Sequence, residues 1–288
     1  MCLLLCLLLP LLWPASAHAW GPATHLSLAA AALEQIVPLG LSLTPLLLRH
    51  RNHFLFGSIA ADETIAKSLA PPARHCHRWE VAFALLDAAP DAATRAFMWG
   101  YLCHLAADTV AHNLYVPHHL VAHVGQHSFS HAYWELRADQ LAPEAAWRLL
   151  AALTAEDHRV GERHLARYLT PTLFSHGVSR RLFYGWLTTV SRPPWRRAMA
   201  RMAARSAWPI TPVVLRPYRQ RALAHTVELL ARGAQATCVR DLDPTGRAAL
   251  REATRLRRLL RRGGWSDAVA AYVPGQLDPA GLAAPPAA

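Results

Sequence analysis

Gly100-Tyr-Leu-Cys-His-Leu-Ala-Ala-Asp-Thr-Val-Ala-His112 is an apolar stretch that carries His104, Asp108 and His112 at intervals of four residues. On an α-helix, which turns by about 100° per residue, these three side chains lie within about 80° of one another on one face. The Leu, Ala and Val residues between them indicate a buried helix, in which imidazole and carboxylate groups need partners that offset their desolvation. Because zinc takes His nitrogen and Asp oxygen as ligands, we predict a metal-binding helix. A polar stripe on a solvated helix is the alternative.

Helical spacing of apolar residues extends over most of the chain. Leu and Ala recur at intervals of three and four residues, Pro and Gly separate the segments, and no convincing alternating β pattern is found. The segments predicted to be helical are 24–37, 79–89, 93–113, 130–141, 144–169, 196–206, 214–233 and 246–262. Asp91 or Thr94 is a candidate cap for the helix that contains the quoted stretch. We therefore expect an all-α fold.

Composition and charge divide the chain into unlike parts. The 288 residues are 53% hydrophobic and include 10 Trp, which excludes a mainly disordered chain. Residues 192–262 hold 17 Arg against four acidic residues, whereas residues 20–190 hold 13 basic and 13 acidic residues and most of the 17 His. We therefore predict a neutral, histidine-rich part (20–190), a basic helical part (191–273), and a disordered tail (274–288) rich in Pro and Ala.

The first 19 residues, MCLLLCLLLPLLWPASAHA, have the pattern of a secretory signal peptide that is cleaved after Ala19. A signal anchor is the alternative, but Pro10 and Pro14 interrupt the apolar run, which is shorter than the roughly 20 residues of a membrane span. We therefore predict export, to the periplasm or the extracellular space. The three cysteines that would remain permit at most one disulfide, and we interpret them as buried small side chains: Cys76, Cys103 and Cys238.

Two other patterns contain possible metal ligands. His131 and Glu135 are four residues apart and share a helix face, with His127 as a competing donor one turn earlier. Trp20 would become the first residue after cleavage, and its free amine and carbonyl oxygen can chelate a metal, joined by His25. The alternatives are a surface pair in the first case and a frayed terminus in the second.

Two smaller features contain an acid and a histidine pair. Asp62 ends an apolar stretch, where an acid is more often a helix cap. His75 and His77 precede the helix predicted at 79–89, and such a pair is usually on the surface. We prefer His77 as the ligand because it is closer to that apolar helix, although the spacing leaves His75 open.

In this order the motifs resemble those of the zinc-dependent phospholipase C family, whose fold is shared by S1/P1-type nucleases. The resemblance covers roughly Trp20 to Asp139 and implies a multi-helix bundle, here with additional C-terminal helices, that binds three zinc ions. It implies that Trp20 and His25 bind one ion, that His77 and His104 bind a second, and that Asp108 bridges these two. It assigns the third ion to His112, His131 and Glu135 and makes Asp62 the candidate general base.

The resemblance implies an exported phosphodiesterase that hydrolyses phospholipids by attack of a metal-activated water on phosphorus. Only three residues separate Asp108 from His112, which is more similar to the glycosylphosphatidylinositol-specific phospholipase D branch than to classical phospholipases C. The head group and the bond cleaved are therefore left open. A nuclease with the same metal cluster and a non-catalytic zinc-binding protein of the membrane surface are the alternatives.

The segment 246–262 has the pattern of a cationic amphipathic helix, with Leu on one side and Arg on the other. A core helix with a solvated Arg face is the preferred interpretation, and docking on anionic lipid is the second. Nucleic acid is not favoured, because no aromatic residues are interleaved with the Arg, and no protein partner is implied. We expect this basic region to lie away from the metal ligands.

Overall fold

The computed structural model describes residues 20–65, 70–122, 131–206 and 210–262. These residues form helices and no strand, so the all-α prediction is confirmed. The predicted signal peptide, His127 and the Pro/Ala tail lie outside the described residues. Within the described ranges, no helix has both the length and the hydropathy of a membrane span.

Helix α6 (Ala92–Val110) is the buried centre of the fold, and every residue from Gly100 to Val110 is buried. Asp91 caps it by accepting a hydrogen bond from the Thr94 backbone N–H at 2.7 Å. The helix does not end near residue 113 as predicted. It continues as a π-helical turn, η4 (Ala111–Tyr115), and then as α7 (Val116–Ala122). A π-helical turn of this kind is frequent at functional sites.

Helix α4 (Arg51–Ala60) packs closely along α6, and a glycine in each helix, Gly57 and Gly100, permits this close approach. A Cβ on Gly57 would overlap the Phe97 carbonyl oxygen, and a Cβ on Gly100 would overlap the Phe54 carbonyl oxygen. The absence of these side chains lets the two backbones approach. As a result, the backbone of α4 lies within hydrogen-bonding reach of the side chains of α6.

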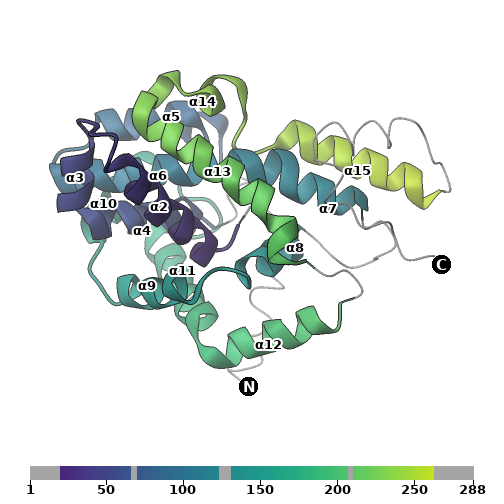
Figure 1. Ribbon diagram of the computed structural model, residues 1–288. Coiled ribbons are helices and arrows are strands. Elements are labelled where there is room, and N and C mark those ends of the chain that lie inside the picture. The colour runs from purple at the N-terminus through teal and green to yellow at the C-terminus, as the bar shows by residue number, and fades with distance from the viewer. Residues whose placement is uncertain (1–19, 66–69, 123–130, 207–209, 263–288) are drawn as a thin grey trace.

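Other helices that pack against α6 include α2 (Pro22–Ile36), α5 (Trp79–Asp87) and α13 (Pro212–Arg232). Figure 1 shows these helices grouped around α6, with α13 running toward α8 (His131–Asp139). The remaining elements are α3 (Thr44–Arg49), η1 (Ala61–Glu63), η3 (Pro72–Arg74), α9 (Glu144–Thr154), α10 (Arg159–Tyr168), α11 (His176–Ser191), α12 (Pro193–Ala204), η5 (Gly233–Gln235), α14 (Thr237–Asp241) and α15 (Arg247–Arg261).

The helix predicted at 144–169 is two helices, α9 and α10. They are separated at 155–158, where the Asp157 carboxylate accepts a hydrogen bond from the Arg159 backbone N–H and so starts a new helix. Helices α3, α4 and α11 were not predicted. In α11, two glycines and a run of Thr and Val weaken the helical pattern, and its apolar face against α9 supplies the stabilisation instead.

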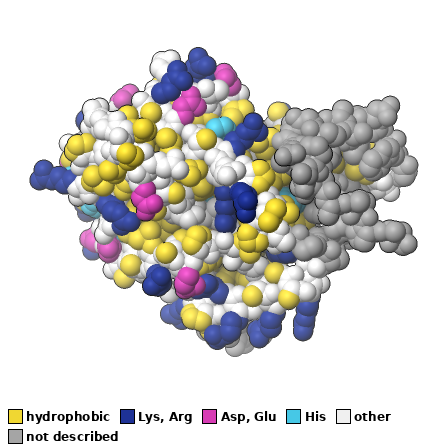
Figure 2. Space-filling model, in the orientation of Figure 1, with side chains coloured by type: hydrophobic (Ala, Val, Ile, Leu, Met, Phe, Trp, Pro, Cys, Tyr) yellow, Lys and Arg dark blue, Asp and Glu magenta, His cyan; other side chains and the backbone are white. Residues whose placement is uncertain are grey.

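The hydrophobic core continues past residue 190. Leu229, Leu230 and Cys238 belong to the same buried cluster as Phe54 and Leu102. The division of the chain at residue 190 stays a prediction. Cys76, Cys103 and Cys238 are buried and free, as expected of small core residues. Figure 2 shows basic side chains spread over the visible face, with several along the lower edge, where Figure 1 places α12.

Candidate metal centre

Three histidines from three parts of the chain converge on the Asp108 carboxylate. His25 Nε2 lies 3.3 Å from Asp108 Oδ1, and the Nε2 atoms of His77 and His104 each lie 3.2 Å from Oδ2. The Nε2 atoms of His77 and His104 are 3.2 Å apart. His25 belongs to the first turns of α2, His104 and Asp108 to α6, and His77 to the loop before α5. All four side chains are buried.

Several of these polar atoms make no hydrogen bond. Both oxygens of Asp108, both ring nitrogens of His25, and Nε2 of His112 are buried and have no hydrogen-bond partner among the described residues. A buried carboxylate left in this way is costly unless a cation compensates it. Buried nitrogen and oxygen atoms that lie this close together and lack hydrogen-bond partners fit a bound cation, and His with Asp is a ligand set that zinc takes.

Two of the histidines are oriented by backbone carbonyls. His104 Nδ1 lies 3.0 Å from the Ser58 carbonyl oxygen, and His112 Nδ1 lies 2.5 Å from that of Pro244. Because a carbonyl oxygen only accepts, Nδ1 donates in both rings, and Nε2 is the nitrogen left to bind a cation. Metal-binding histidines commonly have such a partner, which fixes the ring and its tautomer.

His75 and His77 differ in which groups their side chains contact. The His77 ring reaches Asp108, whereas His75 Nδ1 accepts a hydrogen bond from the His77 backbone N–H at 3.0 Å. His75 therefore shapes the loop that presents His77, and the choice of His77 as the ligand stays a prediction.

A second cluster lies beside the first and consists of His112, His131 and Glu135, whose ligand atoms lie within 4.8 Å of one another. His131 Nε2 is 2.7 Å from Glu135 Oε1, one turn along α8, and the rings of His112 and His131 are 5.0 Å apart. His112 lies in the π-helical turn, with its Nδ1 3.8 Å from Asp108 Oδ2. The two clusters are therefore neighbours.

Asp62 and Trp20 differ in how closely they approach this centre. Asp62 lies in η1, with its Oδ1 3.5 Å from His77 Nε2 and 3.8 Å from His104 Nε2, so its carboxylate reaches the ligand atoms. Trp20 is buried with its ring edge-on to Tyr115, at 6.2 Å between centroids. The next residue, Gly21, accepts a hydrogen bond from the His25 backbone N–H through its carbonyl. A metal-binding role for Trp20 stays a prediction.

Electrostatics keep the clustered groups in the forms that bind a cation. Burial alone would raise the pKa of Asp108, but the neighbouring His104 and His112 hold it well below its usual value. Burial, together with His104, lowers the pKa of His25. Burial is also the main reason that the pKa of His112 falls to about 3, despite the opposing effect of Asp108. At neutral pH these shifts leave a carboxylate at Asp108 and neutral imidazoles at His25 and His112, the forms that bind a cation.

The basic region reaches this centre, contrary to the expectation that it lies away from the ligands. Pro244, just before α15, provides the carbonyl that orients His112. A Cβ on Gly246 would overlap the His112 carbonyl oxygen and lie 2.5 Å from the His112 Cβ, so only glycine fits there, at a φ of 55°. Backbone carbonyls carry no sequence pattern, and this contact was therefore not predictable.

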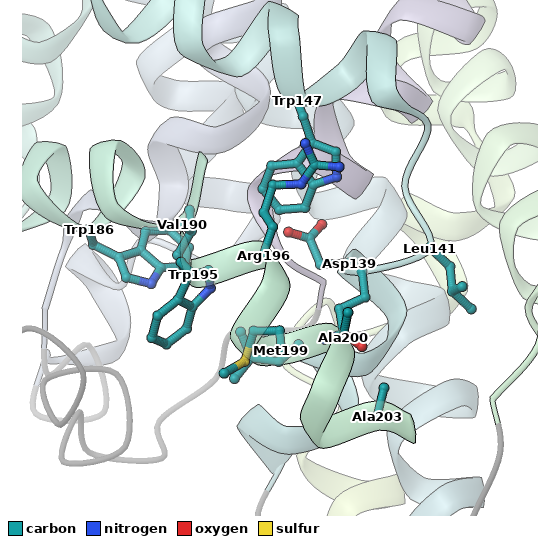
Figure 3. A pocket seen from close by; sticks show the side chains of 12 residues that line it. Asp139, Leu141, Trp147, Trp186, Val190, Trp195, Arg196, Met199, Ala200 and Ala203 are labelled. Carbon is teal, nitrogen blue, oxygen red and sulfur yellow. The ribbon is translucent and has the colours of Figure 1, made fainter. Parts of the chain in front are cut away.

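Asp139, at the end of α8, also lies near the candidate metal ligands. Its buried carboxylate bonds to Thr24 of α2, the residue before His25, and lies against Gly21. On its other side it lines a cavity of about 270 Å³ together with Trp147, Trp195 and Arg196 (Figure 3). No motif singled out Asp139, because its partner is distant in sequence.

A family model described as zinc dependent phospholipase C matches residues 24–175. The matched range contains both clusters and Asp62, whereas Trp20 and Pro244 lie outside it. No curated protein and no solved structure matches the chain.

Proposed function

The chain belongs to the zinc-dependent phospholipase C family and is a zinc-dependent phosphoric diester hydrolase; from this premise we propose that it is exported and hydrolyses phospholipids at a centre of three zinc ions. The observation that carries the proposal is the buried Asp108 carboxylate. Three histidine Nε2 atoms surround it at 3.2–3.3 Å, and neither of its oxygens has a hydrogen-bond partner among the described residues.

The two oxygens of Asp108 face different histidines, which is the arrangement expected of a bridging ligand. Oδ2 faces His77 and His104, and these three residues would hold one ion. Oδ1 faces His25, which would hold another together with the amine and carbonyl of Trp20. The second cluster, His112, His131 and Glu135, would hold the third.

Zinc bound at these residues supplies positive charge for the phosphodiester oxygens and lowers the pKa of a water molecule. The chain's own residues orient the reaction around that charge. The Asp62 carboxylate, within 3.8 Å of His104 Nε2, is placed to accept a proton from the attacking water. Attack on phosphorus then breaks one P–O bond and leaves a phosphomonoester and an alcohol. The same position of Asp62 also fits a metal ligand, because it groups with His25 and His104.

The test combines metal content with hydrolysis. We expect zinc-loaded wild-type protein to contain about three zinc per chain and to release phosphocholine and diacylglycerol from phosphatidylcholine. Asp108→Asn should lose zinc and activity together, because an amide cannot carry the bridging charge. Asp157→Asn, an exposed acid paired with Arg159, is the control and should retain both. Undiminished hydrolysis in Asp108→Asn would exclude the bridging role.

The same assay separates the other interpretations. Hydrolysis of single-stranded DNA without hydrolysis of phosphatidylcholine would indicate a nuclease, and bound zinc without either activity would indicate a non-catalytic protein. Asp62→Asn distinguishes the two roles of Asp62. If Asp62 acts only as the general base, the variant should keep its zinc. If Asp62 is a metal ligand, the variant should lose zinc. Export and the Trp20 amine are tested by the N-terminal mass of the secreted protein, which should begin at Trp20.

A further inference from the structure

Five arginines form a continuous stripe along α15, at successive intervals of four, four, three and four residues. At about 100° per residue they fall within about 80° of one another, over a length of about 22 Å. All five are exposed. The arginine stripe consists of Arg247, Arg251, Arg255, Arg258 and Arg262.

The opposite face of α15 is occupied within the protein. Ala253 and Leu256 are buried in a small cluster with Val121, and Leu120 of α7 packs against it. The apolar side is therefore used to attach α15 to α7 and is not available to insert into a bilayer. What α15 presents outward is charge.

Most of this charge has no acidic partner. Among the described residues, only Arg255 of the stripe pairs with an acid, Glu252, at 2.6 Å. Glu252 is also the only acidic residue of α15. The stripe therefore keeps a strong positive potential along its length, and such a surface attracts an extended array of negative charges.

The stripe begins at the metal centre. Pro244 and Gly246, which lead into α15, contact His112, and Asn113 Nδ2 donates to the Asp243 carbonyl at 2.8 Å. The first arginine of the stripe follows one residue after Gly246. The first arginine of the stripe therefore lies at the end of α15 that adjoins His112, a residue of the second cluster.

We propose that the arginine stripe docks the enzyme on an anionic lipid surface, next to the site that hydrolyses the lipid. This inference rests on the proposed function and adds the partner surface. Arginines near an anionic membrane each contribute attraction that salt weakens. Lipid is favoured over single-stranded nucleic acid because α15 contains no aromatic residue on which a base could stack.

The test compares two variants of equal charge. The stripe variant carries Arg247→Gln, Arg251→Gln, Arg258→Gln and Arg262→Gln, which leaves the Glu252–Arg255 pair intact. The control carries four Arg→Gln changes at exposed positions of α3, α4 and α10, at the opposite end of the molecule in Figure 1: Arg49, Arg51, Arg163 and Arg167. Binding to vesicles of phosphatidylcholine with phosphatidylglycerol is read in the first seconds, by energy transfer from tryptophan to a dansyl lipid.

We expect wild type and control to bind these vesicles at low salt, and the stripe variant to bind at least about 100-fold more weakly. Equal weakening in both variants, or no binding by the wild type, would overturn the proposal. Tighter, stripe-dependent binding to single-stranded DNA than to the vesicles would overturn the choice of lipid.

Monomeric dihexanoyl phosphatidylcholine separates this inference from the proposed function, because it offers no surface. The stripe variant should hydrolyse it at the wild-type rate while losing activity on anionic vesicles. A stripe variant that loses both activities would show that the arginines act on the site and not in docking. If the wild type hydrolyses neither lipid, the proposed function fails, whereas stripe-dependent vesicle binding would still be measured.

Discussion

Asp139 accepts two hydrogen bonds from Thr24, one from its backbone N–H at 2.7 Å and one from its hydroxyl at 2.8 Å. Thr24 is in the first turn of α2, whose own N-cap, Gly21, has no side chain to accept these bonds. Asp139 therefore caps α2 from α8. Because α2 carries His25 and α8 carries His131 and Glu135, this cap joins two helices that bear candidate metal ligands.

Asp139→Ala should both destabilise the protein and displace His25. The Thr24 N–H and hydroxyl would lose their acceptor in a buried place, which costs about 1–3 kcal/mol of unfolding free energy. Zinc content should fall, because the helix that presents His25 is no longer held. Asp91→Ala is the matched control, since it removes the cap of α6 at the end away from the ligands. It should lower stability by about 1 kcal/mol and retain zinc. Full zinc content in Asp139→Ala would contradict the positioning role.

Gly246→Ala should damage the cluster of His112, His131 and Glu135. A Cβ at this position meets the backbone of His112, so the loop and the ring must move apart and the Pro244 contact is lost. Gly40→Ala is the control: its φ of 60° imposes the same backbone strain, but nothing lies within 4 Å of the new Cβ. Both variants should lose about 1 kcal/mol from strain. Only Gly246→Ala should also lose zinc and hydrolysis, as measured by metal analysis and product release.

The sequence alone predicted which candidate ligands share a helix face, because their spacing along the chain determines this. His104 and Asp108 share a face because four residues separate them, and α8 brings His131 to Glu135 for the same reason. The order of the motifs was sufficient to identify the family. The π-helical turn at His112 was not predictable, because nothing in Ala111–Tyr115 distinguishes it from α-helix.

Contacts between segments that are distant in the sequence could not be predicted either. The carbonyl of Ser58 lies within hydrogen-bonding distance of His104 because Gly57 and Gly100 let α4 and α6 approach closely. This approach is a property of the tertiary packing and not of the local sequence. The contact between Asp139 and Thr24 spans 115 residues. These contacts orient the candidate ligands, and they depend on how the helices pack against one another.

Acid should destabilise the metal-free protein through His112. Its folded pKa of about 3 lies below the unfolded value of 6.5, so the unfolded chain binds the extra proton between these values. Stability is then fully present above about pH 6.5 and is lost as the pH falls toward 3. His112→Gln cannot take up this proton. Urea unfolding of chelated protein between pH 7.5 and 4 should show a slope shallower by about 1.4 kcal/mol per pH unit in the variant. Equal slopes would contradict the shift.

Glu63 should give a pH dependence of the opposite sign. It is buried beside Asp62, its Oε2 has no hydrogen-bond partner among the described residues, and burial together with Glu162 raises its pKa to about 8. The folded chain therefore keeps a proton that the unfolded chain releases above 4.5. Stability from this group is present at low pH and is lost as the pH rises from 4.5 through 8.

Glu63→Gln removes this penalty, because the amide is neutral and of similar shape. The unfolding free energy of the variant relative to wild type should increase with pH, by up to about 4 kcal/mol between pH 5 and pH 9. Urea denaturation of the zinc-loaded proteins at pH 5, 6.5, 8 and 9 measures this difference. At each pH, zinc should stabilise the wild type and the variant equally, so that its contribution cancels. Glu34→Gln, at an exposed position of α2, should show no such increase. A constant difference for Glu63→Gln would mean that this carboxyl is ionised at neutral pH, and then its negative charge would add to those of Asp62 and Asp108 around the metal centre.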